Sequence, residues 1–368
     1  MLFTIESLDP ECAWLTNFLE SILLQVWYPI TVATLSREVR KIVDAAFQKC
    51  TSYDPALREF LVDFVLNDFG FRGVSSVQSA KIGGSAHLVN FKGSDTVIAS
   101  KMIRDLYNTE TIYGLSIPAT EHSIMTLNGE EGELEMMRRV LTMFPTGLVA
   151  CVSDSYNIFR ACAQYWGQDL IDLILSRPAE PGNQLVIRPD SGHVINSLRE
   201  IFHILFDKFG YTVNDKGYKV LPPQVRVIQG DGVNLESIKE IYAMLEDEKI
   251  SPENLALGMG GKLLQDCNRD TLNFATKACF AVVDGEERNV VKSPTEMDAD
   301  GNITKSFKKS KQGKLKLVKN DDGTYRTVTS MDADFDTVKD ELVEVFRMGE
   351  ILVEYTFEEI RERAKVTN

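Results

Sequence analysis

The sequence predicts an α/β protein with a parallel sheet, either a (β/α) barrel or a doubly wound sheet, followed by a smaller antiparallel α+β part. From about residue 66, short and nearly continuous apolar runs alternate with helical stretches. Such runs are typical of parallel strands that are covered on both faces. A polar or glycine-rich cluster follows each run, and after about residue 280 the pattern changes to alternating hairpins. In a barrel, the polar clusters would all meet at the C-terminal face of the strands, where barrel active sites lie.

The N-terminal region, residues 1–60, is expected to be a helical segment. Asp9 can cap a first helix and Pro10 suits its first turn. We expect Pro29 to end this helix, and a second helix to run from about residue 34 to residue 49.

The apolar runs define a barrel domain at residues 61–280. Each run has the length of one buried strand and ends in polar residues or glycine. The expected strands are residues 88–91, 114–118, 147–152, 185–187, 225–228 and 255–257.

The last part, residues 281–368, is expected to complete an antiparallel α+β accessory domain. Alternating segments at 314–318 and 324–328 flank an Asp-Gly turn, which is a strong hairpin signal. A second hairpin is expected around Met348-Gly349, and a final helix from about residue 357 to residue 365.

Composition excludes several classes of protein. The 368 residues carry a net charge of −14, which argues against a surface for duplex DNA or anionic membranes. No apolar run is expected to reach the ~18–20 residues of a membrane span, and the first residues lack a signal peptide's cationic and apolar regions. The six cysteines show no CxxC or zinc spacing, so we expect free thiols and a cytoplasmic protein.

Acidic and histidine side chains follow the expected strands. Carboxylates suit ribose hydroxyls and Mg²⁺, and the glycines at 258–261 suit phosphate, because backbone N–H groups can then approach an anion. No GxSxG motif is present, and the four histidines are too far apart in the sequence for a metal cluster. The polar candidates at the strand ends are Arg72, Asp95, His122, Asp154, Arg188, Asp190 and Asp231.

Several longer motifs resemble the nicotinamide phosphoribosyltransferase family, in order from about residue 2 to about residue 365. The resemblance implies an irregular type II phosphoribosyltransferase (β/α) barrel with a partial antiparallel α+β accessory domain. It implies a pentosyltransferase that joins nicotinamide to 5-phosphoribosyl 1-pyrophosphate, giving nicotinamide mononucleotide and pyrophosphate in NAD salvage. Mg²⁺ would be the cofactor and ATP a coupled co-substrate. The motifs lie at residues 68–76, 87–96, 121–123, 153–156, 187–192 and 227–233.

The resemblance also implies a role for each site residue. Phe69 would stack on the pyridine ring, and Asp95 would accept a hydrogen bond from the carboxamide. The catalytic residues would be His122, which contacts pyrophosphate and becomes phosphorylated, with Asp154 and Asp190 near the ribose and Mg²⁺-bound water. No metal ligand is directly assigned. The other implied substrate-binding residues are Arg72, Ser116, Arg188, Gly230, Asp231, Gly260, Gly261, Arg269, Lys277 and Lys292.

Two departures from the family pattern leave alternatives open. Ala150 stands where the family usually has a serine, and Met1 falls about 120 residues after the family's usual start. We therefore expect a homodimer with weak activity alone, with a separately encoded N-terminal segment as a further partner. The alternatives are an inactive or split fragment that binds nucleotides or regulates a partner, and a nicotinate phosphoribosyltransferase. Asp95 argues against nicotinate, because a carboxylate repels a carboxylate.

Overall fold

The computed structural model describes residues 1–305 and 310–366. The chain forms two compact units. The first, here called the hairpin unit, comprises Met1–Trp27 and Leu272–Tyr355, and the second, the barrel unit, comprises Tyr28–Thr271 and Thr356–Asn368. This division differs from the ranges 1–60, 61–280 and 281–368 expected from the sequence, because residues 28–60 and the last helix group with the barrel unit.

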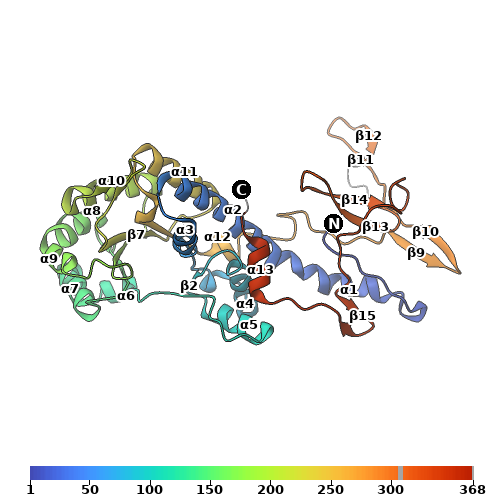
Figure 1. Ribbon diagram of the computed structural model, residues 1–368, viewed down its shortest axis with the longest axis horizontal. Helices are drawn as coiled ribbons and strands as arrows, with labels where there is room; N and C mark the ends of the chain where they lie inside the picture. Colours follow the sequence, from blue (N-terminus) through green and yellow to red (C-terminus); the bar gives the residue numbers. More distant parts are fainter. Residues whose placement is uncertain (306–309, 367–368) are drawn as a thin grey trace. The chain divides into compact units, whose positions relative to one another are not determined.

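A six-stranded parallel sheet forms the centre of the barrel unit, in the order β2-β1-β8-β7-β4-β3 (Figure 1). Every neighbouring pair in this sheet is parallel. All strands therefore end at the same edge, as the sequence predicted. The strands are β1 (Leu66–Asp68), β2 (Gly93–Ser94), β3 (Val149–Val152), β4 (Leu185–Arg188), β7 (Val225–Gln229) and β8 (Leu255–Met259).

An irregular segment, residues 115–119, links the two edges of this sheet. Leu115 bridges to Gly93 in edge strand β2, and Ala119 bridges to Ala150 in edge strand β3, both in parallel orientation. The sequence predicted a regular strand at 114–118, but only isolated bridges form. Pro118 explains part of this difference, because proline has no N–H to donate to a ladder.

Side-chain alternation separates two apolar layers of the barrel unit. Ala150 and Val186 are register partners on β3 and β4, and with Ile228 of β7 they form a small cluster that packs against Phe69. The residues on either side of Ala150 and Val186, and Val227 before Ile228, belong to the main core. This follows from the two-residue period of a strand.

Helices surround the parallel sheet of the barrel unit (Figure 1). The N-cap side chains of Asp54, Ser76, Asn157, Asn234 and Thr356 accept backbone N–H bonds at the helix starts. The helices of this unit are α2 (Trp27–Cys50), α3 (Pro55–Val62), α4 (Val77–His87), α5 (Val97–Tyr107), α6 (His122–Met125), α7 (Glu133–Met143), α8 (Ile158–Arg160), the π-helix η5 (Ala161–Asp169), α9 (Ile171–Leu175), α10 (Val194–Phe209), α11 (Leu235–Asp247), α12 (Gly261–Leu264) and α13 (Phe357–Ala364), with short 3₁₀ turns η3 (Phe71–Gly73), η4 (Glu130–Gly132) and η6 (Pro252–Asn254).

Two local predictions are wrong. Residues 88–91 are not a strand: the N–H groups of Leu88 and Phe91 bond to the carbonyls of Gly84 and His87, which continues the end of α4 as a turn. Pro29 does not end a helix either, because it lies in the first turn of α2, where a missing N–H costs nothing.

One helical stretch is longer and more apolar than the sequence analysis expected. Leu15–Cys50 spans 36 residues and contains an 18-residue window of mean hydropathy 1.3, which passes a membrane-span test by length and composition only. Its second half supplies Val39, Val43 and Phe47 to the core of the barrel unit. That half is a core helix.

The hairpin unit contains the antiparallel part. The predicted Asp-Gly hairpin is confirmed as β13 and β14, with Gly323 at φ +83° in its turn, and the second predicted hairpin is confirmed as the shorter pair β15 and β16. This unit also contains η1 (Pro10–Cys12), α1 (Leu15–Leu23) and η2 (Leu24–Val26). Its strands are β9 (Phe280–Val283), β10 (Glu286–Asn289), β11 (Thr295–Met297), β12 (Ile303–Lys305), β13 (Leu315–Lys319), β14 (Tyr325–Thr329), β15 (Phe346–Arg347) and β16 (Glu350–Ile351), and the barrel unit adds the hairpin of β5 (Thr212–Val213) and β6 (Lys219–Val220).

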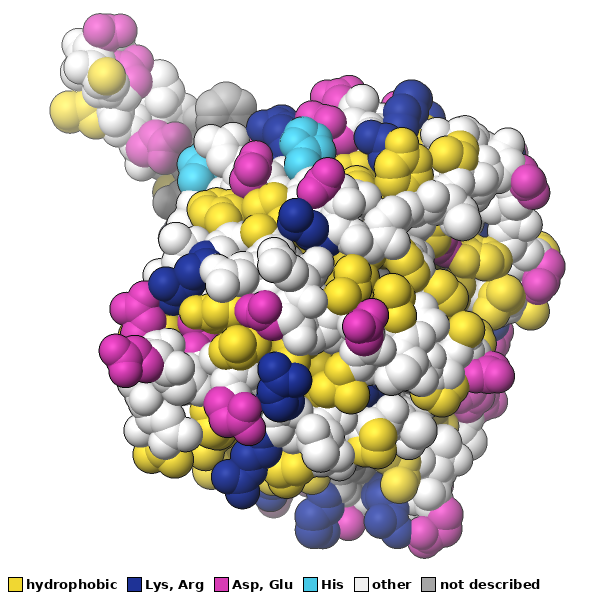
Figure 2. All heavy atoms as spheres, turned by 90° about the vertical axis from the view of Figure 1, so that its left-hand side faces the viewer, with side chains coloured by type: hydrophobic (Ala, Val, Ile, Leu, Met, Phe, Trp, Pro, Cys, Tyr) yellow, Lys and Arg dark blue, Asp and Glu magenta, His cyan; other side chains and the backbone are white. Residues whose placement is uncertain are grey.

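The surface carries charges of both signs. Figure 2 shows acidic and basic side chains interspersed with apolar ones on one face. All six cysteines are free thiols, as predicted.

Candidate active site

A polar cavity of about 420 Å³ opens at the C-terminal ends of β1, β4, β7 and β8. The expected barrel face therefore does carry a cavity. Its lining includes most of the glycines and charged residues that the sequence placed after these strands. The lining residues are Phe69, Arg72, Gly73, Arg188, Asp190, Gly230, Asp231, Gly232, Val233, Asn234, Gly260, Gly261 and Lys262.

Phe69 follows β1 directly, and its ring packs against Gly258 of the neighbouring strand β8. A Cβ atom added to Gly258 would lie only 2.0 Å from Cε2 of the Phe69 ring. Only glycine leaves room for the ring at this position. The guanidinium of Arg188 lies 5.2 Å from the ring centroid, a cation–π distance. One aromatic face is thus fixed beside a cation at the cavity.

Arg188 and Asp190 form an ion pair at the end of β4. Nη2 and Nε of Arg188 lie 3.0 and 3.3 Å from Oδ1 of Asp190, and both side chains are mostly buried. A Cβ added to Gly230 would approach both groups, to 3.2 Å from Asp190 Oδ1 and 3.4 Å from Arg188 Nε. Glycine at this position lets the loop after β7 pass close to the pair.

His122 and Asp154 form a second pair, from the first residue of α6 and the loop after β3. Nε2 of His122 lies 2.9 Å from Oδ1 of Asp154. The other oxygen, Oδ2, accepts from the Asp190 backbone N–H at 3.1 Å and from the Ser191 hydroxyl at 2.6 Å. A carboxylate can only accept hydrogen bonds, so Nε2 carries the proton of this pair, and in the neutral ring Nδ1 keeps its lone pair.

Asp95 and Ser116 meet beside β2. The Ser116 hydroxyl donates to Oδ1 of Asp95 at 2.5 Å. The Asp95 N–H donates to the Asp68 carbonyl at 3.0 Å, which ties Asp95 to β1, the strand directly before Phe69. One carboxylate oxygen therefore remains to accept a hydrogen bond from a ligand. Ala150 is buried inside the barrel and has no side-chain polar group to offer.

Asp68, the last residue of β1 beside Phe69, was not singled out by sequence analysis. It is fully buried, and its Oδ1 accepts from the Gly70 N–H at 2.7 Å. Burial raises the pKa of Asp68 to about 6, against the opposing effect of the Gly70 hydrogen bond. Its position between an apolar strand and Phe69 was the signal available in the sequence.

The structure does not gather every predicted residue at the cavity. Arg269 is exposed and pairs with its neighbour Asp270. Lys277 and Lys292 belong to the hairpin unit, and their predicted contacts with phosphate stay predictions. The residues Asp95, Ser116, His122 and Asp154 lie at the same end of the strands but do not line the cavity itself. Sequence analysis did not single out Gly73, Val233, Asn234 or Lys262, whose types are common in ordinary turns and helix caps.

The residues at the cavity fit a metal that the substrate would help to hold. Across residues 1–305 and 310–366, no three His, Cys, Asp or Glu side chains form a group that could hold an ion. Asp190 already shares Oδ1 with Arg188, so one of its oxygens remains. This fits Mg²⁺, which is commonly held by one or two carboxylates plus substrate phosphates.

The chain is similar to known proteins over nearly its whole length. The model of the nicotinate phosphoribosyltransferase (NAPRTase) family matches residues 64–348. The nicotinamide phosphoribosyltransferase of Xanthomonas campestris is 44% identical over 99% of this chain and 75% of that protein. The enzyme of the same name from Acinetobacter baylyi is 31% identical over 98% of this chain and 72% of that protein. The chain thus spans about three quarters of the length of these relatives.

A solved structure shares the fold. The crystal structure of nicotinate-nucleotide pyrophosphorylase from Pyrococcus furiosus aligns with a TM-score of 0.50 at 14% identity. The alignment covers 90% of this chain and 68% of that one. This similarity supports the phosphoribosyltransferase barrel as the architecture.

Proposed function

The chain belongs to the nicotinate phosphoribosyltransferase (NAPRTase) family, and we propose that within it the protein is a nicotinamide phosphoribosyltransferase acting in NAD salvage. The observation that carries the proposal is the Asp95 carboxylate, held by Ser116 beside the strand directly before Phe69. An ionised carboxylate accepts a hydrogen bond from an amide and repels a carboxylate. This chemistry selects nicotinamide over nicotinate.

In the proposed reaction the pyridine nitrogen attacks C1 of 5-phosphoribosyl 1-pyrophosphate. The C1–O bond breaks and its electron pair leaves with pyrophosphate, so positive charge develops on the ribose. The carboxylates of Asp190 and Asp231 border the cavity and stabilise that charge. Arg72 and Arg188 supply cations for the phosphate groups. The pyridine nitrogen is a weak nucleophile, so its placement by Phe69 is a large part of the catalysis.

Mg²⁺, when bound with the pyrophosphate, would neutralise charge on the leaving group. Asp190 would hold it through its free oxygen or a water. Two residues of this chain position the groups around the substrate. Arg188 orients Asp190, and Gly230 lets its loop approach the ribose hydroxyls.

His122 is proposed to couple ATP to the reaction. Asp154 fixes the Nε2–H tautomer, which leaves Nδ1 as the nucleophile. Nδ1 would attack the γ-phosphorus of ATP, the bond to the bridging oxygen would break, and ADP would leave with that electron pair. The resulting phosphohistidine would lie at the end of the strands that hold the cavity.

The function is tested with the purified protein, Mg²⁺ and 5-phosphoribosyl 1-pyrophosphate, with nicotinamide or nicotinate, and with or without ATP. Chromatography of the products should show nicotinamide mononucleotide. If nicotinate mononucleotide is the only product, the substrate is nicotinate and the proposed preference for nicotinamide is wrong. If neither product forms, the proposal of a nucleotide-binding or regulatory protein gains support over the enzyme.

The role of His122 is tested by His122→Ala. The variant should lose ATP-dependent, acid-labile phosphorylation, measured by mass spectrometry at neutral pH. His203→Ala is the matched control, because His203 is an exposed helical histidine that pairs with Glu248 away from the cavity. Phosphohistidine that persists in His122→Ala would move the role to another residue.

A further inference from the structure

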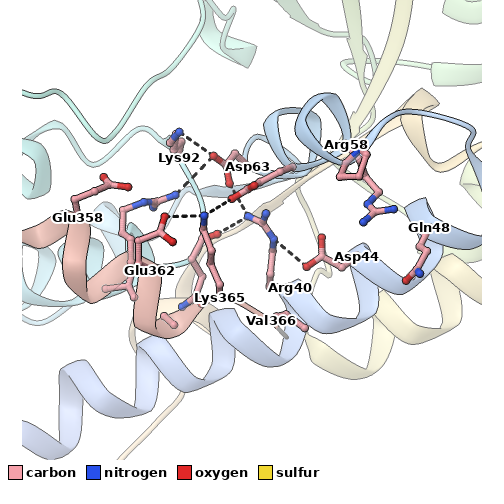
Figure 3. Close-up of a pocket in the computed structure, with 16 residues that line it drawn as sticks. Arg40, Asp44, Gln48, Arg58, Asp63, Lys92, Glu358, Glu362, Lys365 and Val366 are labelled. Carbon is pink, nitrogen blue, oxygen red and sulfur yellow. Dashed lines mark hydrogen bonds and ion pairs between the residues drawn. The ribbon is translucent and has the colours of Figure 1, made fainter. Parts of the chain in front are cut away.

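A second polar cavity, of about 260 Å³, lies beside α2, α3 and the C-terminal helix α13 (Figure 3). Asp63, at the end of α3, forms ion pairs with three cationic side chains there. Its Oδ1 lies 2.6 Å from Nη1 of Arg40, and its Oδ2 lies 2.9 Å from Nζ of Lys92 and 3.6 Å from Nη2 of Arg361. Arg40 comes from α2 and Arg361 from α13, and both are about nine-tenths buried.

The two arginines also bind the backbone of residues 88–92, here called the clamp segment. Nη1 of Arg40 donates to the Asn90 carbonyl at 2.7 Å. Nη1 of Arg361 donates to the carbonyls of Leu88 and Phe91, the latter at 3.2 Å. The planar fork of the Arg361 guanidinium lets Nη1 bind the carbonyls while Nη2 faces Asp63, whereas lysine has a single nitrogen.

The clamp segment leads directly into the residues proposed to recognise the carboxamide. The Lys92 carbonyl accepts the Leu115 N–H at 2.8 Å, and the Leu115 carbonyl accepts the Ser94 N–H at 2.9 Å. These bonds set the register between Asp95 and Ser116, whose side chains meet at 2.5 Å.

The buried side chain of His87 contacts the carbonyl of Gly93, the residue that follows the clamp segment. Its Nε2 lies 3.1 Å from the Gly93 carbonyl, and its Nδ1 lies 3.0 Å from the Ser36 hydroxyl. Burial lowers the pKa of His87 to about 4, so this ring stays neutral at physiological pH. The position of Asp95 is therefore built from α2, α4 and the far end of the chain.

We propose that Arg361 is a positioning residue for nicotinamide: through the clamp segment, the C-terminal helix sets the placement of the Asp95–Ser116 pair. The inference rests on the proposed function, because it names the carboxamide as the group that Asp95 and Ser116 receive. Arg361 touches no substrate itself. Its loss would leave two buried carbonyls without donors and would remove one cation from Asp63.

The kinetic test compares Arg361→Met and Arg361→Lys with the parent chain. Arg361→Met should raise the KM for nicotinamide about tenfold, the usual scale of coupling between sites. The KM for 5-phosphoribosyl 1-pyrophosphate should stay within about twofold, since its contacts share no partner with Arg361. Arg361→Lys keeps the charge but has only one nitrogen for Asp63 and both carbonyls, so its KM for nicotinamide should fall between those of the parent and Arg361→Met. Lys365→Ala is the control, because Lys365 also ties α13 to α3, through Glu59, and contacts no carbonyl of the clamp segment.

A second readout does not depend on activity. Hydrogen–deuterium exchange of the free protein should be faster at Ser94 and Asp95 in Arg361→Met, and unchanged there in Lys365→Ala. If exchange rises equally across the whole barrel unit and both KM values move together, Arg361 is a general stabilising residue and the inference is wrong. Unchanged exchange and an unchanged KM for nicotinamide in both Arg361 variants would also overturn it. If the parent forms no nicotinamide mononucleotide, the proposed function fails, while the exchange at Ser94 and Asp95 still decides whether Arg361 acts on this segment.

Discussion

Single side chains at the strand ends differ in how fully their neighbours constrain them. Asp154 uses both oxygens, one for His122 and one for Ser191 and the Asp190 N–H. Asp95 uses one oxygen for Ser116. A carboxylate with both oxygens hydrogen-bonded holds its neighbours in place, whereas one with an unoccupied oxygen can receive a ligand. We therefore expect Asp154 to orient His122 and Asp95 to receive the ligand.

Asp95→Ser should erode the preference for nicotinamide over nicotinate by about 1–3 kcal/mol, the scale of an unpaired polar contact. The measurement is the ratio of kcat/KM values for the two substrates. Ser116→Ala is the companion variant: it removes a donor but keeps the repelling carboxylate, so it should still reject nicotinate. Equal kcat/KM for both substrates in the unmodified protein would refute the role of Asp95.

Asp68→Asn should change how stability depends on pH. Burial raises the pKa of Asp68 from 3.8 to about 6, so the folded state favours the protonated form. Its contribution to stability is fully present below pH 3.8 and is lost as pH rises through about 6. That loss is about 3 kcal/mol for a shift of about two units.

Urea unfolding of the Asp68→Asn variant and the parent at pH 4.5 and pH 7.5 checks this. Relative to the parent, Asp68→Asn should have a higher free energy of unfolding at pH 7.5 than at pH 4.5, because the asparagine side chain does not ionise. Asp215→Asn, in the exposed β5–β6 turn, should show no such difference. A constant gap between Asp68→Asn and the parent at both pH values would contradict the raised pKa.

Neighbouring strands position the aromatic platform. β1 pairs with β8 so that Asn67 lies opposite Gly258, and the Phe69 ring, just beyond the end of β1, covers that glycine. The ring therefore depends on a missing side chain in the adjacent strand. This is a property of the strand pair, which neither strand has alone.

Gly258→Ala should displace the Phe69 ring, because the added Cβ would lie 2.0 Å from Cε2. We expect a higher KM for nicotinamide and a loss of about 1–3 kcal/mol in unfolding free energy, as in other overpacked sites. Phe69→Ala and the double variant complete a double-mutant cycle. In the Phe69→Ala background the stability cost of Gly258→Ala should largely vanish. An undiminished cost would place the clash elsewhere.

At the scale of the whole chain, two surface properties bear on its partners: the net charge of −14 and an exposed apolar face. The charge disfavours nucleic acid. Trp14, the N-cap residue of α1, lies about one turn from Phe18, which lies about one turn from Ile22, and each is about 60% exposed. A contiguous apolar face of this kind favours association with another protein surface. A second copy of the chain remains our expected partner.

Phe18→Glu should weaken this self-association. Light scattering of the unmodified chain should give the mass of a dimer, and the variant should shift toward the monomer, since a charge buried in an interface is costly. Leu106→Glu is the matched control, because Leu106 is similarly exposed on α5 of the barrel unit. A monomeric parent chain would contradict the predicted homodimer.

Much of the architecture followed from local sequence patterns. The apolar runs at 147–152, 185–187, 225–228 and 255–257 correspond to β3, β4, β7 and β8, because a buried parallel strand needs a continuous apolar run. The Asp-Gly hairpin and the final helix could also be predicted from short stretches of sequence, because turn chemistry and helix capping depend on a few neighbouring residues. The strand-end residues could be predicted because parallel strands all end on one face. The β1 strand and the turn at 88–91 could not, because three-residue strands and helix ends carry little periodicity.

The sequence by itself determined which residue types stand at the strand ends, and through its motifs the family and reaction class. Only the tertiary structure decided which of these residues touch. Phe69 meets Gly258, Asp154 meets the Asp190 N–H, and Arg361 meets a carbonyl 273 residues away along the chain. Periodicity and turn signals report conformations over a few residues, whereas these contacts arise when distant segments pack into one barrel. The placement of the recognition residues is therefore a property of barrel closure, which no local pattern encodes.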